Sequence, residues 1–231
     1  MANFTISAND GGSFGGYLAL PASTPAPAIL VIQEIFGVNQ VMRDTCDWLA
    51  KQGFVAFCPD LFWRIEPGID ITDKTEAEWK HAFHLFTTFD VDQGVDDLKA
   101  SLAALRAHDA SNGKVGAVGY CLGGKMAYLM AARSDVDASV GYYGVGINEL
   151  TDEAAGIVKP LMLHIATEDE FVPKAAQQQV KAALSGQTGI TLHSYQGQDH
   201  AFARIGGAHF DQNAADLANG RSLDFFRQHL N

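Results

Sequence analysis

The chain has 231 residues, of which 47% are hydrophobic and 19% are charged. These values are typical of a globular protein with one large core, and they predict a single domain over residues 1–231. With 27 acidic and 16 basic residues, the formal net charge is −11, which argues against binding to nucleic acid or to an anionic membrane.

The cysteines Cys46, Cys58 and Cys121 show no paired spacing. They therefore predict neither a disulfide framework nor a zinc site. No apolar stretch approaches the ~20 residues of a membrane span, and the first residues lack the features of a secretory signal. We expect a cytoplasmic protein.

Short runs of β-forming residues alternate with longer segments of helical period. This alternation predicts an α/β fold, with a mostly parallel, twisted sheet covered by helices on both faces. The expected strands cover residues 14–20, 28–33, 55–58, 115–120, 138–143, 161–166 and 190–195. The expected helices lie at 41–49, at 95–105, after Gly123, at 174–184 and at 212–229.

Residues 64–80 are polar and weakly periodic. Long loops in compact domains are more often functional than idle, so this segment is expected to act as a mobile lid. The proline-rich residues 21–27 are expected to form a surface loop between strands.

One short motif carries the clearest chemical signal, and it reads Gly119-Tyr120-Cys121-Leu122-Gly123-Gly124. It follows an expected strand and precedes an expected helix, as the nucleophile elbow of an α/β-hydrolase does, with glycines where side chains would clash. The helix N-terminus would favour a thiolate at Cys121. A lone Gly-x-Cys-x-Gly is also compatible with a buried, inert cysteine, but the position between strand and helix favours a nucleophile.

The α/β-hydrolase fold places its catalytic groups in the chain order nucleophile, acid, base. Asp169 follows the strand at 161–166, where an acid is expected, and Glu168 and Glu170 compete with it. A helix-capping or solvated carboxylate is the alternative role for this aspartate. The residues alone leave the choice among the three carboxylates open.

His200 lies in a loop after the last expected strand and is the candidate base. There it would take the thiol proton and return it to the leaving group, while an acid behind it fixes the tautomer. His200 is distinguished from the other histidines by its position and not by its residue type. Of the other histidines, His164 is expected to be a satisfied core residue, and the following are expected at the surface: His81, His84, His209 and His229.

Nearly the whole chain resembles the dienelactone hydrolase family. The matching landmarks occur in order along the sequence, and they are 33–39 (Gln-Glu-Ile-Phe-Gly-Val-Asn), 58–61 (Cys-Pro-Asp-Leu), 119–124, 141–144 (Gly-Tyr-Tyr-Gly), Asp169 with 171–173 (Phe-Val-Pro), and 200–204 (His-Ala-Phe-Ala-Arg). The resemblance implies an α/β-hydrolase fold and an enzyme that cleaves a small ester or lactone without a metal or an organic cofactor.

The resemblance also implies roles for individual residues. Cys121 would be the nucleophile, His200 the base and Asp169 the acid. Glu34 would contact the resting thiol, and a thiolate beside this carboxylate would stay disfavoured until substrate displaces it. The backbone N–H groups of Leu122 and Ile35 would form the oxyanion hole.

The chain departs from the family pattern where the substrate is held. The family binds a carboxylated lactone with two arginines; Arg204 matches one, and Trp79 stands in place of the other. Phe83 replaces a tyrosine and Phe86 a tryptophan, so this helix presents a more apolar wall. Lys80 would supply a second cation, but a flexible ammonium does not reproduce a bidentate arginine clamp.

These observations predict a hydrolase of small esters or lactones, with or without a carboxylate on the substrate. Arg204 is expected to contact a substrate carboxylate, and Phe36 is expected, with Phe83 and Phe86, to form apolar walls. One alternative is a broad carboxylesterase or thioesterase without preference for a dienelactone. Another is a non-catalytic protein in which Cys121 serves redox sensing or ligand binding.

Overall fold

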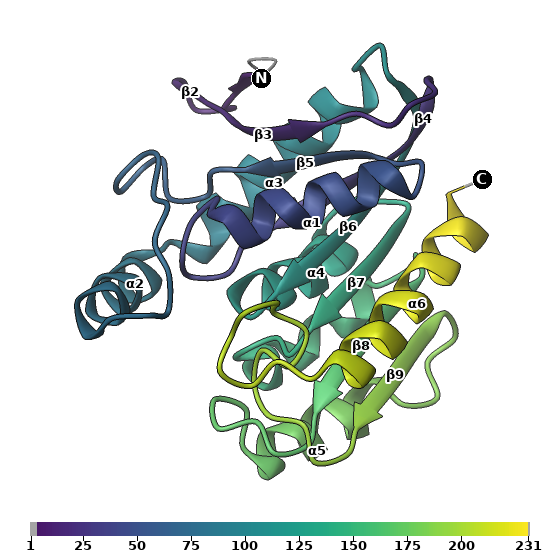
Figure 1. Ribbon diagram of the computed structural model, residues 1–231. Helices are drawn as coiled ribbons and strands as arrows, with labels where there is room; N and C mark the ends of the chain where they lie inside the picture. The colour runs from purple at the N-terminus through teal and green to yellow at the C-terminus, as the bar shows by residue number, and fades with distance from the viewer. Residues whose placement is uncertain (1–3, 231) are drawn as a thin grey trace. The chain divides into compact units, whose positions relative to one another are not determined.

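The computed structural model describes residues 4–230 and divides into two compact units, Met1–Gly116 and Ala117–Asn231 (Figure 1). Strand β6 (Ser111–Tyr120) begins in the first unit and ends in the second. Its last six residues, from Val115 on, are buried. The second unit therefore begins within the buried end of β6, and this strand ends at Tyr120, directly before Cys121.

The first unit contains two pairs of antiparallel strands and one parallel pair. β1 (Ile6–Ser7) and β2 (Ser13–Phe14) form a short hairpin, and β3 (Gly16–Ala19) pairs antiparallel with β5 (Val55–Pro59). On its other side, β5 pairs parallel with β4 (Ala26–Ile32). Every residue of β5 is buried, as expected for a strand covered on both faces.

Helices α1 (Gln40–Lys51) and α3 (Val91–Arg106) pack against these strands, and Figure 1 shows α1 in front of them and α3 behind. The third helix of the unit is α2 (Glu76–Thr88). Side chains at the N-caps fix where the helices begin: Asn39 accepts from an N–H of α1, and Asp90 accepts from two N–H groups of α3.

In the second unit, strands β7 (Ala138–Tyr142), β8 (Leu161–Ala166) and β9 (Ile190–Tyr195) pair in parallel. Helix α4 (Leu122–Arg133) packs against β7 and also against the 3₁₀ segment η1 (Ile147–Gly156). Helix α5 (Lys174–Leu184) contacts η1, and α6 (Gln212–His229) packs on β7 and β8, on the near side in Figure 1. Successive strands are thus joined through helical segments, as parallel pairing requires.

Two expectations about local structure need correction. The expected strand at 14–20 is two strands that meet at Gly15, because β2 pairs with β1 whereas β3 pairs with β5. The segment at 64–80 is not loop throughout, since α2 begins at Glu76. Thr75 accepts a hydrogen bond from the Glu78 N–H, which caps this helix.

The rest of the segment at 64–80 is tied to the first unit by specific contacts. Arg64 forms ion pairs with the buried Asp97 and with Asp10, both at 2.8 Å. The N–H of Ile71 donates to the Phe36 carbonyl at 3.2 Å. Its function as a lid stays a prediction.

Candidate active site

Cys121 occupies a sharp turn between β6 and α4. Its φ is 55° and its ψ is −115°, a conformation that non-glycine residues rarely adopt. The Cys121 N–H donates to the Tyr142 carbonyl at 3.1 Å, and its carbonyl accepts from the Gly124 N–H at 3.0 Å. Cys121 is the N-cap residue of α4, so the positive partial charge of the helix N-terminus lies close to this residue.

The glycines around Cys121 are required by close backbone approach. A Cβ atom on Gly119 would lie 1.9 Å from the Gly123 carbonyl oxygen, and one on Gly124 would lie 2.4 Å from the Tyr142 oxygen. Both distances are far shorter than any real contact, and both neighbours are backbone atoms that cannot rotate away. The Gly-x-Cys-x-Gly-Gly pattern is therefore the steric condition for placing α4 against β6 and β7.

Replacing Gly124 with alanine is expected to lower the free energy of unfolding by at least about 1–3 kcal/mol, because the added methyl group overpacks a rigid site. Urea denaturation followed by circular dichroism measures the loss. Gly220→Ala is the matched control: Gly220 lies inside α6 with open space around its Cα, so this variant should be unchanged or slightly more stable. Equal stability of the two variants would contradict the steric argument.

His200 and Asp169 form a buried pair in the second unit. The His200 Nδ1 lies 2.9 Å from Asp169 Oδ2 and 3.0 Å from Oδ1, and both residues are 5% exposed. Asp169 Oδ1 also accepts from the N–H groups of Phe171 and Val172, which hold the carboxylate in its own loop. Since a carboxylate can only accept, Nδ1 carries a proton and leaves Nε2 for the nucleophile.

The two carboxylates that compete with Asp169 face elsewhere. Glu168 is exposed and forms an ion pair with Lys174 at 2.9 Å, and Glu170 is exposed. Neither has the burial that strengthens a hydrogen bond to an imidazole. The geometry therefore favours Asp169 as the partner of His200.

The side chain of Cys121 hydrogen-bonds to His200. Burial of the imidazole lowers the pKa of His200, but the charge of Cys121 and the hydrogen bonds to Asp169 and Cys121 outweigh burial and raise it to about 10. A histidine with such a pKa is protonated at neutral pH and can donate a proton to a leaving group.

Sequence reasoning missed two strained residues beside this pair. Tyr143 has a φ of 37° and Ala201 a φ of 61°; with Cys121, they are the non-glycine residues of positive φ in the described part of the chain. The Tyr143 ring packs edge-on against the His200 ring, with centroids 5.0 Å apart, and Ala201 follows His200 directly. Strain of this kind concentrates at functional sites.

The other cysteines have the opposite environment. Cys46 and Cys58 are fully buried, and burial raises the pKa of both thiols well above its ordinary value. They are therefore held as unreactive thiols.

The first unit contains the segment 34–36, which is expected to contribute to the site. This segment is distant in sequence from Cys121. Glu34, Ile35 and Phe36 follow β4 after one intervening residue, Gln33, and are 2%, 5% and 2% exposed, respectively. Gly37, at a φ of 77°, forms an isolated β-bridge with Asp70, which holds the end of this loop in place. Sequence reasoning did not predict this bridge.

The aromatic residues of α2 form a stack that includes Phe36. The Trp79 ring stacks on Phe83 with centroids 5.5 Å apart, and Phe36 meets Trp79 edge-on at 5.2 Å. Phe83 is 42% exposed, and Phe86 is half-buried. Lys80, the alternative cation, is exposed on the same helix.

Arg204 belongs to the second unit, in the same loop as His200. It is half-buried, and its N–H donates to the Ala201 carbonyl at 2.9 Å. Gly207 allows the guanidinium to lie close, since a Cβ there would be 2.9 Å from the Arg204 Nε.

Of the histidines, His164 is buried and hydrogen-bonded to Tyr195 and Ser222, as a satisfied core histidine should be.

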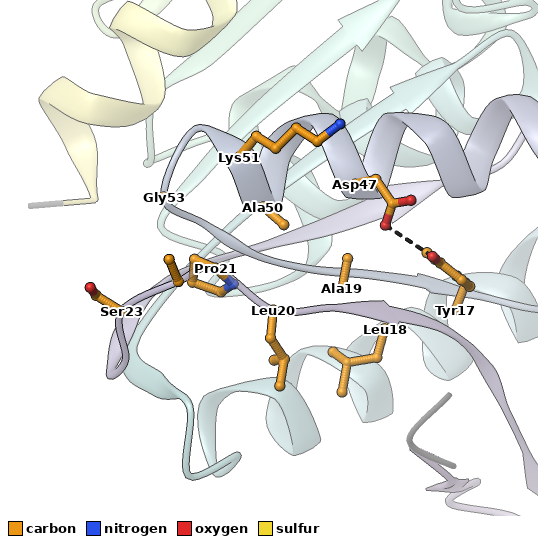
Figure 2. A pocket seen from close by; sticks show the side chains of 11 residues that line it. Tyr17, Leu18, Ala19, Leu20, Pro21, Ser23, Asp47, Ala50, Lys51 and Gly53 are labelled. Carbon is orange, nitrogen blue, oxygen red and sulfur yellow. Dashed lines mark hydrogen bonds between the residues drawn. The ribbon is translucent and has the colours of Figure 1, made fainter.

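Further hollows lie within single units. An open groove of about 550 Å³ runs between β3 and α1 in the first unit, where Figure 2 shows Tyr17 donating to Asp47. It contains none of the expected site residues. A small cavity of about 30 Å³ in the second unit is lined by Tyr143, His164 and Asp169.

Among the described residues, no cluster of His, Cys, Asp and Glu has the arrangement of a metal site, and no helix has the length and apolar composition of a membrane span.

Comparison with known proteins identifies the family of this chain. A model of the dienelactone hydrolase family matches residues 14–230. The chain belongs to this family. A protein of Azospirillum brasilense named "Putative carboxymethylenebutenolidase" is 53% identical over all of both chains. The carboxymethylenebutenolidase of Pseudomonas putida is 42% identical over 96% of this chain and 94% of its own.

A crystal structure supports the same assignment. The "Putative Dienelactone Hydrolase" of Klebsiella pneumoniae superposes with a TM-score of 0.84 at 25% identity and covers 99% of this chain and all of its own. The predicted α/β-hydrolase fold and the membership of the dienelactone hydrolase family are confirmed. The protein is an enzyme, a hydrolase of the carboxymethylenebutenolidase class.

Proposed function

We propose that this dienelactone hydrolase family member cleaves small esters or lactones through a thioester on Cys121, with His200 as acid and base and Asp169 as the group that orients it. The single observation that supports this proposal is the hydrogen-bonded series from Asp169 through His200 to a cysteine in a strained elbow. Nucleophile, base and orienting acid in this order are the requirements of covalent acyl transfer.

Acylation begins when the Cys121 thiolate attacks the carbonyl carbon and the C–O π electrons move to oxygen. The N–H of Leu122 at the start of α4 would bind this oxyanion, and Ile35 is proposed to supply the second N–H. One such donor contributes about 3 kcal/mol to the transition state. As the oxyanion collapses, the bond to the leaving oxygen breaks and the His200 imidazolium protonates that oxygen.

Deacylation uses the same histidine in the opposite direction. Once the sulfur is acylated it carries no charge, so a main cause of the raised pKa of His200 is gone and the imidazole becomes neutral. It then takes a proton from water, whose oxygen attacks the thioester carbonyl. Expulsion of the thiolate releases the acid, and the proton on His200 then returns to the sulfur to restore the resting thiol. Glu34 is proposed to contact the resting thiol before substrate arrives.

The pH dependence of kcat/KM is expected to show its alkaline limit near 10. The pKa of His200 is raised from 6.5 to about 10, so the imidazolium that protonates the leaving oxygen persists between these values and is lost only as pH rises through about 10. Because kcat/KM reports the free enzyme, a neutral ester measured from neutral to alkaline pH tests this directly. Spontaneous hydrolysis at each pH must be subtracted. An alkaline decline centred near 6.5 would contradict the proposed role of a protonated His200.

The substrate class follows from two opposing features. Arg204 is proposed to bind a substrate carboxylate, which favours a carboxylated lactone such as the carboxymethylenebutenolide named in the relatives. The stack of Phe36, Trp79 and Phe83 favours a neutral, apolar group and therefore supports a broad carboxylesterase as the second candidate.

Turnover of carboxymethylenebutenolide and of a neutral aryl ester separates the two candidates. A lactone hydrolase should process the lactone with the larger kcat/KM, and Arg204→Gln should raise KM for the lactone while leaving the aryl ester unchanged. If the aryl ester is preferred and Arg204→Gln affects neither substrate, the broad esterase is the better description.

A further inference from the structure

Asp199 connects the two loops that carry the acid and the base. Its Oδ1 accepts a hydrogen bond from the His200 N–H at 2.7 Å and a second from the Glu170 N–H at 3.2 Å. We propose that Asp199 is a positioning residue, which holds the His200 loop and the Asp169 loop in register so that the imidazole and the carboxylate meet. This inference rests on the proposed function, because it assigns His200 and Asp169 their roles in the reaction.

Other connections bring the same loops together at the end of the sheet. The Thr167 N–H donates to the Tyr195 carbonyl, and the Gly197 N–H donates to the Thr167 hydroxyl at 2.9 Å. One step further along, the Glu168 N–H donates to the Gln198 carbonyl at 2.8 Å. Asp199 comes next in this series and makes the connection directly adjacent in sequence to both members of the catalytic pair.

The carboxylate acts here as an acceptor, and its charge is secondary. Its side chain is 33% exposed, so water screens the charge. What matters is that one oxygen reaches two N–H donors in different loops. An amide oxygen of the same length would reach both donors too, whereas a hydroxyl or a methyl group would reach neither.

His209 supports the same peptide from the other side. Its Nδ1 donates to the His200 carbonyl at 3.2 Å, because a carbonyl can only accept, and lies 3.7 Å from Asp199 Oδ2. Both backbone groups of His200 are therefore held by side chains, its N–H by Asp199 and its carbonyl by His209. Catalytic groups need support of this kind, since a displacement of about 1 Å costs on the order of 100-fold in rate.

Three variants and a matched control test the proposal with carboxymethylenebutenolide and a neutral aryl ester. Asp199→Ala is expected to lower kcat by about 10- to 100-fold with KM within about two-fold, because substrate binding is untouched while the histidine is loosened. Asp199→Asn should keep most of the activity. Asp199→Ser is too short to reach Glu170 and should behave like alanine. Glu170→Gln removes a charge from the same loop and should match wild type.

The alkaline limit of kcat/KM gives a readout that a purely structural role would not move. If the hydrogen bond from His200 to Asp169 is weakened, the limit should shift to lower pH in Asp199→Ala and Asp199→Ser, and stay in place in Asp199→Asn and Glu170→Gln. Thermal unfolding of each variant shows whether the fold is intact. If Asp199→Ala unfolds, the comparison of Asp199→Ser with Asp199→Asn tests the positioning role.

Unchanged kcat and pH limit in Asp199→Ala and Asp199→Ser would overturn the positioning role. Equal impairment of Asp199→Asn and Asp199→Ala would overturn it too, because the charge and not the acceptor would then matter. In both cases an inactive Cys121→Ala variant would leave the proposed function standing. Retained hydrolysis in Cys121→Ala would instead refute the proposed function itself.

Discussion

Replacing Cys121 with alanine is expected to lower ester and lactone hydrolysis by at least about 10⁴-fold, to the level of the remaining binding and oxyanion contacts. The reason is that the thiol of Cys121 supplies the nucleophile in the elbow, with a hydrogen bond to His200. Initial rates with both substrates measure the loss. Cys121→Ser should retain a small part of the activity, because a hydroxyl in the same place is a weaker nucleophile than a thiolate.

Cys46→Ala is the control for the loss of a cysteine as such. Cys46 lies on α1, fully buried, and its thiol is held protonated, so this variant should keep its rate if it folds. If Cys121 serves only redox sensing or ligand binding, Cys121→Ala should keep its rate of hydrolysis. Peroxide should then modify the thiol of the wild-type protein.

Asp169→Asn is expected to have the second-largest effect, lowering kcat by about 10³- to 10⁴-fold. The carboxamide is nearly the same shape, but it can present an N–H to His200 Nδ1 and so favour the wrong tautomer. The pKa of His200 should fall as well, because the Asp169 hydrogen bond and charge are among its causes. Steady-state kinetics and the pH profile of kcat/KM measure the two effects separately.

Glu168→Gln and Glu170→Gln provide the matched controls, since they change the carboxylates on either side of Asp169 in the same way. Both side chains are exposed, so both variants should stay close to wild type. A large loss of activity in either variant, with normal rates in Asp169→Asn, would show that the neighbouring glutamate, and not Asp169, is the acid.

Elements with strong local signals could be predicted closely from the sequence. Strands β8 and β9 and helices α5 and α6 match the expected ranges, because turn or capping residues mark their limits: Pro173 precedes α5, and Asp211 caps α6. The break at Gly15 could not be predicted, since it arises from a change of strand partner that is not encoded locally. Helix α2 has a usable signal in the Thr75 to Glu78 spacing, typical of a capping box.

The positions of the candidate site residues could be predicted in part. The order of Cys121, Asp169 and His200 follows from the elbow and from the ends of two strands, and the structure brings these residues together in the second unit. The choice of Asp169 over its neighbours needed burial, which a sequence does not display. The roles of Asp199 and Tyr143 depend on contacts between distant loops. The catalytic roles of Cys121, His200 and Asp169 stay predictions, as do the roles of Glu34, Ile35 and Arg204.

The central claim is a covalent acyl intermediate on Cys121, and mass spectrometry of the trapped intermediate tests it most directly. Wild type is mixed with a slowly deacylating aryl ester, quenched in acid, digested and mapped. The predicted result is one acyl group on the peptide containing Cys121, none on the peptides containing Cys46 or Cys58, and none in Cys121→Ala. An acyl group on any other residue, or turnover without an acylated enzyme in single-turnover experiments, would contradict the proposed mechanism.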